Sequence, residues 1–139
     1  MTRSPDRHQP ATAADVHRRV VDAINGGRRE EALALIDPDV LDHRGGPSGD
    51  HRGIDAWRAK WEHMHDGLEN VSATIEHNVT AGDTSVNRYT LRATHVDSGR
   101  SYEIQALDMI RVRDGKLVEH WALADLAAMH HQLSPDNAT

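Results

Sequence analysis

Residues 101–123 read SYEIQALDMIRVRDGKLVEHWAL and carry the clearest structural signal in the chain. In Ser101–Arg113 the even positions are mostly apolar and the odd positions mostly polar, which is typical of a strand with one buried face. Asp114-Gly115 is a strong signal for a tight hairpin turn. The stretch therefore predicts two antiparallel strands, the second running from Leu117 to about Leu123.

Two further strands are expected before this hairpin, at Val71–Val79 and Val86–His95. In the second of them the even positions are polar, so the odd positions are expected to face inward. These odd positions are Asn87, Tyr89, Leu91, Ala93 and His95. The second half of the chain therefore predicts an antiparallel meander.

The first half has helical periodicity. Val16, Val20 and Ile24 are four residues apart, after a capping pattern at Thr12–Asp15 and before Asn25-Gly26-Gly27, where a helix can end. The other expected elements are a helix at Glu30–Ile36, a strand at Val40–His43, a loop at Arg44–Gly53, and helices at Ile54–His65 and Leu126–Gln132.

Helices grouped on one face of a meander define an α+β fold. We expect N-terminal helices packed on a strongly curved, mostly antiparallel sheet, forming a cone-shaped α+β barrel around one apolar pocket. The domain is expected to span residues 12–133, with disordered tails at 1–11 and 134–139.

Composition excludes several classes of function. The 139 residues contain no Cys, and the formal net charge is −6 without a basic stripe, so disulfides, thiolate metal sites and nucleic-acid binding are not expected. The histidines lack metal-ligand spacing, so no metal is expected. No apolar run is long enough to span a bilayer and no secretory signal is visible, which predicts a cytoplasmic protein with no membrane partner.

Several motifs resemble one known family. They are Ala93-Thr94-His95, the run Leu107–Trp121, Asp125 and Gln132-Leu133. From about Asp15 to Leu133 the chain is similar to the SnoaL-like polyketide cyclases of the nuclear transport factor two-like superfamily. It departs from the family pattern at Ala93 and Ser134, where Gly is usual, and in a shorter turn at Val96–Gly99.

The resemblance implies a cofactor-free enzyme that uses an acidic residue as acid and base. An apolar, polyketide-like carbonyl compound would be the substrate, and ring closure by an intramolecular aldol reaction the leading expectation. The same class also includes isomerases, hydratases, dehydratases and hydroxylases. It implies a homodimer through the outer face of the sheet, where Leu107, Met109 and Val118 are apolar.

Asp125 is the first candidate for the acid/base group. If the last strand continues far enough, Leu117, Glu119, Trp121, Leu123 and Asp125 share one face, and burial there would raise the pKa of the Asp125 carboxyl. The structural alternative is that Asp125 caps the following helix, because Asp is a favoured N-cap residue.

Asp108 and His95 complete the predicted catalytic set. Asp108 lies on the inferred inner face of its strand, where Asp is uncommon, and His95 could polarise a carbonyl or transfer a proton. The structural alternatives are a buried Asp108 paired with Arg or Tyr, and a His95 that lies at the rim or in a turn. The predicted substrate-binding residues are Trp57, Trp61, Tyr89, Trp121 and His43.

A non-catalytic module that binds a small molecule or dimerises is the main alternative to an enzyme, because a fold alone does not define a function. Two acids and a histidine in one apolar cavity would favour the enzyme. An Asp125 that caps a helix, with Asp108 held by an Arg, would favour the binding module.

Overall fold

The computed structural model describes residues 11–44 and 49–135. Three helices, α1 (Ala13–Asn25), α2 (Arg29–Leu33) and α3 (Ile54–His65), belong to the first half of the chain. Strands β1 (Ile36–His43) and β2 (Asp50–Arg52) lie before and after the gap. The second half holds β3 (Leu68–Ala81), β4 (Thr84–His95), β5 (Ser101–Arg113), β6 (Lys116–Ala124) and α4 (Leu126–Leu133).

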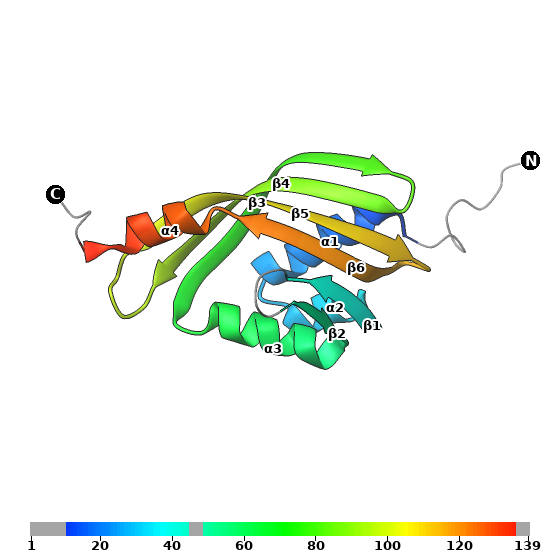
Figure 1. The fold of residues 1–139 in the computed structure, drawn as a ribbon, viewed down its shortest axis with the longest axis horizontal. Helices are drawn as coiled ribbons and strands as arrows, with labels where there is room; N and C mark the ends of the chain where they lie inside the picture. Colours follow the sequence, from blue (N-terminus) through cyan, green and yellow to red (C-terminus); the bar gives the residue numbers. More distant parts are fainter. Residues whose placement is uncertain (1–10, 45–48, 136–139) are drawn as a thin grey trace, which may run out of the picture.

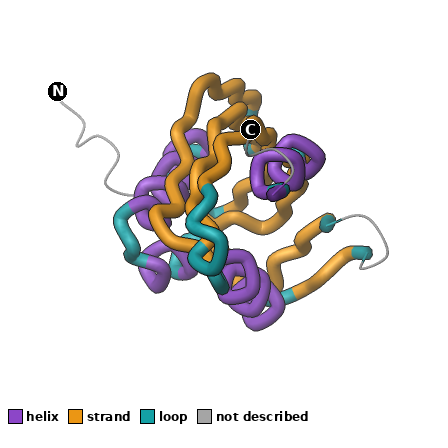
Figure 2. The backbone as a smooth tube through the Cα atoms, turned by 90° about the vertical axis from the view of Figure 1, so that its left-hand side faces the viewer, coloured by secondary structure: helices purple, strands orange, loops and turns teal. Residues whose placement is uncertain are grey.

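The strands form one six-stranded sheet in the order β2-β1-β6-β5-β4-β3. Every neighbouring pair is antiparallel except β1 and β6, which run parallel. The sheet is open, with β2 and β3 at its edges. Figure 1 shows β3 and β4 bending midway toward α3, and the side view in Figure 2 shows a bent layer of strands. The predicted α+β class and the mostly antiparallel, curved sheet are confirmed.

The helices close one side of this bent sheet. Helix α1 contacts β3, β4, β5 and β6, and α3 contacts β1, β2 and β3. Thr12 caps α1 by accepting a hydrogen bond from the Asp15 backbone N–H, as the capping pattern predicted. The apolar face of α1 and the two Trp of α3 pack against Val40, Ile110 and Leu117. The resulting core lies between the helices and the parallel pair β1–β6.

The structure differs from the sequence-based elements mainly around the first two strands. Helix α2 ends at Leu33 instead of Ile36, because β1 already begins at Ile36 and accommodates Asp37-Pro38 at an irregularity in its pairing with β6. Strand β2 lies within the segment expected to be a loop. The predicted disordered tails fall almost entirely outside the described residues.

A β-bulge in β6 changes which of its residues face the core. Leu117 pairs with Val112, but Glu119 pairs with the preceding residue, Arg111, so Val118 is an extra residue on this strand. From there on His120 shares the inner face with Ile110, its pairing partner on β5. The prediction that Leu117, Glu119, Trp121, Leu123 and Asp125 share one inner face is therefore wrong beyond Leu117.

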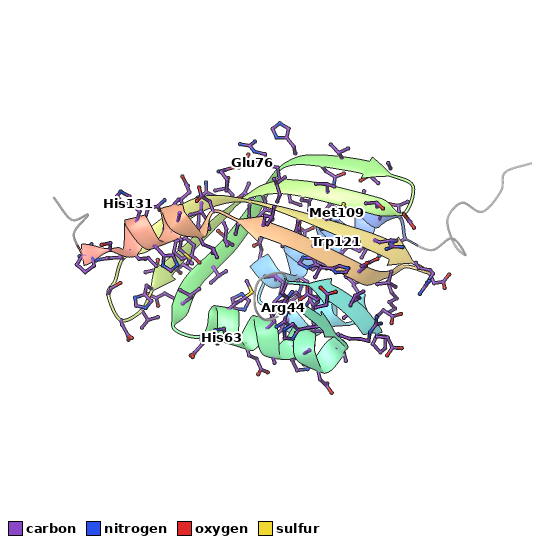
Figure 3. All side chains as sticks on the ribbon, viewed as in Figure 1. Arg44, His63, Glu76, Met109, Trp121 and His131 are labelled. Atoms are coloured by element: carbon purple, nitrogen blue, oxygen red, sulfur yellow. The ribbon has the colours of Figure 1, made fainter. Side chains whose placement is uncertain are left out.

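Part of the outer face of the sheet is apolar. Met109 and Trp121 pair with each other on β5 and β6 and are labelled side by side in Figure 3. Leu107 and Leu123 form the next outward pair, with 47% and 77% of their surface exposed. Among the described residues, no helix is long and apolar enough to cross a membrane.

Candidate active site

A cavity of about 430 Å³ lies between the bent sheet and helices α1 and α3. Its wall is mostly apolar, with Val20 and Ile24 from α1, Trp61 and Met64 from α3, and Leu91 from β4. Charged and polar side chains gather on one part of its lining. They are His17, Asp42, Arg44, Lys60, Tyr89, Asp108 and His120.

Asp108 is the central carboxylate of this group. Its Oδ1 lies 2.8 Å from Nε2 of His17, and its Oδ2 lies 3.4 Å from Nε2 of His120. Burial acts to raise the pKa of Asp108, but the hydrogen bonds from His120 and His17 outweigh it and lower the pKa to about 2. Asp108 therefore stays ionised at neutral pH, although its side chain is only 17% exposed.

His120 links Asp108 to a second buried carboxylate. Nδ1 of His120 lies 2.8 Å from Oδ1 of Asp42. The other oxygen of Asp42 accepts hydrogen bonds from Lys60 Nζ at 2.8 Å and from Arg44 Nε at 2.9 Å. Burial acts to raise the pKa of Asp42, but hydrogen bonds from His120 and Lys60 and their charges hold it well below its usual range.

The aromatic side chains of α3 fix the orientation of this charged cluster. The Trp57 ring meets the His120 ring edge to face, with centroids 4.9 Å apart. Lys60 Nζ lies 3.5 Å from the centroid of the Trp57 ring, on the same helix. Burial lowers the pKa of Lys60, while the charge of Asp42 opposes this shift. The cluster is thus packed on Trp57 and is not free to reorient.

Tyr89 is placed on the inner face of β4, as its parity predicted, and lines the cavity. Burial first, and then the negative charge of Asp108, raise the pKa of its phenol above the usual value. Among the described residues no hydrogen-bond partner is found for its hydroxyl. Tyr89 therefore presents a protonated O–H near Asp108, able to donate to an oxygen of a bound ligand.

Five of the predicted site residues line this cavity, namely His43, Trp57, Trp61, Tyr89 and Asp108. The imidazole of His43 also makes contacts away from the charged cluster. The His43 ring stacks on Trp121 with centroids 4.7 Å apart, and its nitrogens lie within hydrogen-bond distance of Asp50 and Glu119. Trp121 itself is not among the lining residues, because the bulge in β6 turns it to the outer face.

The predictions that Asp125 and His95 face the cavity are wrong. Asp125 is exposed and caps α4, where its Oδ1 accepts a hydrogen bond from the Ala128 N–H at 3.0 Å. His95 is the last residue of β4, and its Nδ1 is 2.9 Å from the hydroxyl of Ser98 in the following turn. Asp125 and Asp108 therefore do not face one cavity. Asp108 is held by two histidines and not by an Arg.

The structure adds candidate site residues that the sequence-based prediction missed. His17 lies three and four residues before Val20 and Val21 on the apolar face of α1, and Asp42 lies two residues after the buried Val40 on β1. Helix periodicity for His17 and strand periodicity for Asp42 indicate that both polar side chains face inward. His120 was assigned to the wrong face by the undetected bulge. In the described part of the chain, no group of three or more His, Cys, Asp and Glu could hold a metal ion.

The comparisons agree with this architecture. The chain belongs to the SnoaL-like polyketide cyclase family, whose model matches residues 14–133. No curated protein matches it. Among solved structures, IdmH from Streptomyces antibioticus, a candidate polyketide cyclase, is 31% identical with a TM-score of 0.80, covering 88% of this chain and 99% of its own.

Two other solved structures extend the likeness. TsrD from Streptomyces laurentii is 26% identical with a TM-score of 0.74, covering 87% of this chain and 93% of its own. A SnoaL-like protein from Jannaschia is 19% identical with a TM-score of 0.79, covering 100% of this chain and 99% of its own, and it supports the fold alone.

Proposed function

We propose that this chain is a cofactor-independent cyclase that closes a ring in an apolar, polyketide-like carbonyl compound by an intramolecular aldol reaction. The observation that carries the proposal is the position of Asp108, a buried carboxylate held between His17 and His120 at the wall of an apolar cavity. The family membership and the likeness to IdmH support the cyclase assignment.

The reaction uses one proton twice. The Asp108–His120 pair takes a proton from the carbon next to a substrate carbonyl, and the C–H electrons form an enolate. The Tyr89 hydroxyl donates a hydrogen bond to the enolate oxygen. The enolate carbon then attacks a second carbonyl of the same molecule, forming the C–C bond, and the new alkoxide takes the proton back from the pair.

The cavity wall supplies orientation. Trp61, Val20 and Leu91 surround the apolar part of the ligand and hold the chain folded, so that its two reacting carbons lie close together. Water excluded by these side chains would otherwise compete for the Tyr89 hydroxyl.

Proton exchange at a model ketone tests the proposal without the natural substrate. In D₂O, the protein should speed deuterium uptake at the methyl group of 2-acetonaphthone, measured by NMR. Asp108→Asn should reduce this acceleration by about 10²–10⁴-fold, as expected for loss of a general base. The matched control, Asp97→Asn, lies in the exposed turn between β4 and β5 and should retain it.

A different outcome would favour the binding module. If 2-acetonaphthone quenches the fluorescence of Trp57 and Trp61 but exchanges no faster than in buffer, the cavity holds ligands without acting on them. Retention of the full exchange rate by Asp108→Asn would remove Asp108 from the mechanism.

A further inference from the structure

We propose that a hydrogen-bond chain through Asn78 and Ser85 fixes His17 as a neutral donor to Asp108, so that His120 is the histidine that takes up and releases the proton. The catalytic meaning of this assignment rests on the proposed function. The protonation states themselves belong to the resting protein and can be measured without a substrate.

The chain begins on β3. Asn78 Nδ2 lies 3.2 Å from the Val86 carbonyl oxygen, a backbone atom that can only accept. The amide nitrogen of Asn78 therefore faces β4, where its two hydrogens are shared among this carbonyl, Oδ1 of Asn87 at 2.8 Å and Ser85 Oγ at 2.8 Å. Ser85 is fully buried, with 0% of its surface exposed.

The Ser85 hydroxyl, because it accepts from Asn78, determines which hydrogen-bond role His17 Nδ1 takes. Its oxygen accepts from Asn78, so its single proton is free to donate to His17 Nδ1, 2.8 Å away. Nδ1 of His17 is then an acceptor, and the ring proton lies on Nε2. Nε2 donates to Asp108 Oδ1, also at 2.8 Å. Both ring nitrogens of a neutral His17 are satisfied. A second proton, on Nδ1, would take away the acceptor of the Ser85 hydroxyl proton.

His120 carries its fixed proton on the other ring nitrogen, Nδ1. Its Nδ1 faces Asp42, a carboxylate that also binds Lys60 and Arg44 and can only accept. Nδ1 of His120 therefore carries a proton in every state of the ring. Its Nε2 faces Oδ2 of Asp108 across 3.4 Å, longer than the His17 contact.

This second contact has room for one proton. When this proton is absent, a lone pair on His120 Nε2 faces a lone pair on Asp108 Oδ2. With it, His120 becomes an imidazolium that donates to Asp108. The proton taken from the substrate carbon enters this position and leaves it for the alkoxide oxygen, so the protein returns to its starting state after each turnover.

Among the described residues, the groups in contact with the two rings come from several elements. His120 faces Asp42 from β1, Asp108 from β5 and the Trp57 ring from α3, and Lys60 of α3 binds Asp42. His17 faces Ser85 from β4 and Asp108 from β5. Arg44 binds the far oxygen of Asp42, and Tyr89 lies within electrostatic reach of Asp108.

Nitrogen NMR of the histidines reads the tautomers directly. Two-bond ¹H–¹⁵N spectra of ¹⁵N-histidine protein would be recorded over the range in which imidazoles titrate, about pH 5 to 8, and assigned with His17→Gln and His120→Gln. His17 should show a protonated Nε2 and an unprotonated Nδ1 throughout. His120 should keep its Nδ1 proton and gain or lose only the proton on Nε2.

Asn78→Asp reverses the chain with almost no change of shape. The new carboxylate can only accept, so Ser85 donates to it and accepts from His17 Nδ1, which makes His17 an imidazolium. Asn87 can accommodate the change, because its buried Nδ2 has no partner among the described residues and its amide can turn over to donate. Asn70→Asp, an equal change of charge at an exposed position on β3, is the control.

The expected result is that His17 gains an Nδ1 proton in Asn78→Asp over most of the range, and not in Asn70→Asp. A wild-type His17 that carries its proton on Nδ1, or that titrates together with His120, would overturn the proposal even if the variants did not fold. An Asn78→Asp spectrum with an unchanged His17 would do the same. These measurements do not depend on the rate of ketone exchange, so they test the protonation states independently of the proposed cyclase function.

Discussion

Asp42 and Asp108, which are 66 positions apart in the sequence, face opposite nitrogens of one imidazole ring. That ring belongs to His120, and the bulge at Val118 is what places it between them. Two buried carboxylates would repel each other without the ring and the cations Lys60 and Arg44. Their ionised state is therefore a condition of the native structure as well as of the proposed chemistry.

The stability of this protein should depend more steeply on acid pH than the stability of a variant without the Asp108 carboxyl. The pKa of Asp108 is about 2 in the folded protein and near 3.9 in an unfolded chain. A lowered pKa stabilises the fold above the unfolded value, by about 2 kcal/mol here, and this contribution is lost as the pH falls from about 5 to 2. Urea unfolding at a series of pH values should show a flatter dependence for Asp108→Asn than for wild type.

Asp42 should add to the same dependence, because its pKa is also held below the usual range. Lys60→Met removes one of its hydrogen-bond donors and should move the acid unfolding midpoint to higher pH. Lys60→Arg keeps the charge and should move it less. A free energy of unfolding that does not change between pH 5 and about pH 3 in wild type would contradict both expectations.

Removal of the Tyr89 hydroxyl should affect turnover more than binding. Tyr89→Phe should lower the rate of ketone exchange by about 10²–10³-fold, the usual effect of losing one oxyanion donor. Fluorescence titration with 2-acetonaphthone should give nearly the same affinity, because the ring still lines the cavity. Tyr102→Phe is the matched comparison, since Tyr102 also lines the cavity but lies six residues from Asp108 along β5. Equal rates for Tyr89→Phe and wild type would exclude the hydroxyl from the reaction.

How far the sequence predicts this site depends on where strand periodicity is interrupted. Along β4 and β5 the alternation is continuous in register, and the inner positions of Tyr89 and Asp108 follow from counting residues. In β6 a single extra residue, Val118, inverts the count for every later position. No residue type marks that bulge, so Trp121 and His120 exchange faces without any local signal.

Other parts of the site depend on contacts between distant segments. His17 and Asp42 occupy positions that periodicity marks as inward, but a single polar residue there does not reveal its partner. The partner of His17 is Asp108, 91 residues away, and it becomes visible only when α1 packs on β5. Tertiary packing also determines that Arg44 and Lys60 share the Asp42 carboxylate.

The outer face of the sheet should form a homodimer. Leu107 and Leu123 are directly opposed on β5 and β6, and 47% and 77% of their surfaces are exposed. Such a patch would be covered by the same face of a second copy. Light scattering at micromolar concentration should give twice the mass of the chain. Leu123→Asp should give the monomer mass, while Val96→Asp, at an exposed position in the turn after β4, should not.

A monomer mass for the wild-type protein would contradict this expectation. So would a Leu123→Asp variant that remains dimeric, because the contact would then lie elsewhere.

Asp125 provides the test that separates the sequence-based mechanism from the structural one. As a helix cap it accepts a hydrogen bond from the Ala128 N–H, and Asn caps a helix as well as Asp does. Asp125→Asn should therefore keep both the free energy of unfolding and the exchange rate close to wild type, whereas Asp108→Asn keeps little of the rate. Asp125→Ala should lower the free energy of unfolding by about 0.5–2 kcal/mol, because α4 loses its cap.

The reason for the difference is placement. Helix α4 packs Ala128, Met129 and Leu133 on a small apolar cluster around Tyr102 and Ile104, apart from the histidines that surround Asp108. A carboxylate at the exposed start of that helix has no histidine to share a proton with. If Asp125→Asn instead lost about 10²-fold or more in exchange with normal ligand affinity and stability, proton transfer would belong to Asp125. Asp108 would then be a structural carboxylate that holds His17 and His120 in place.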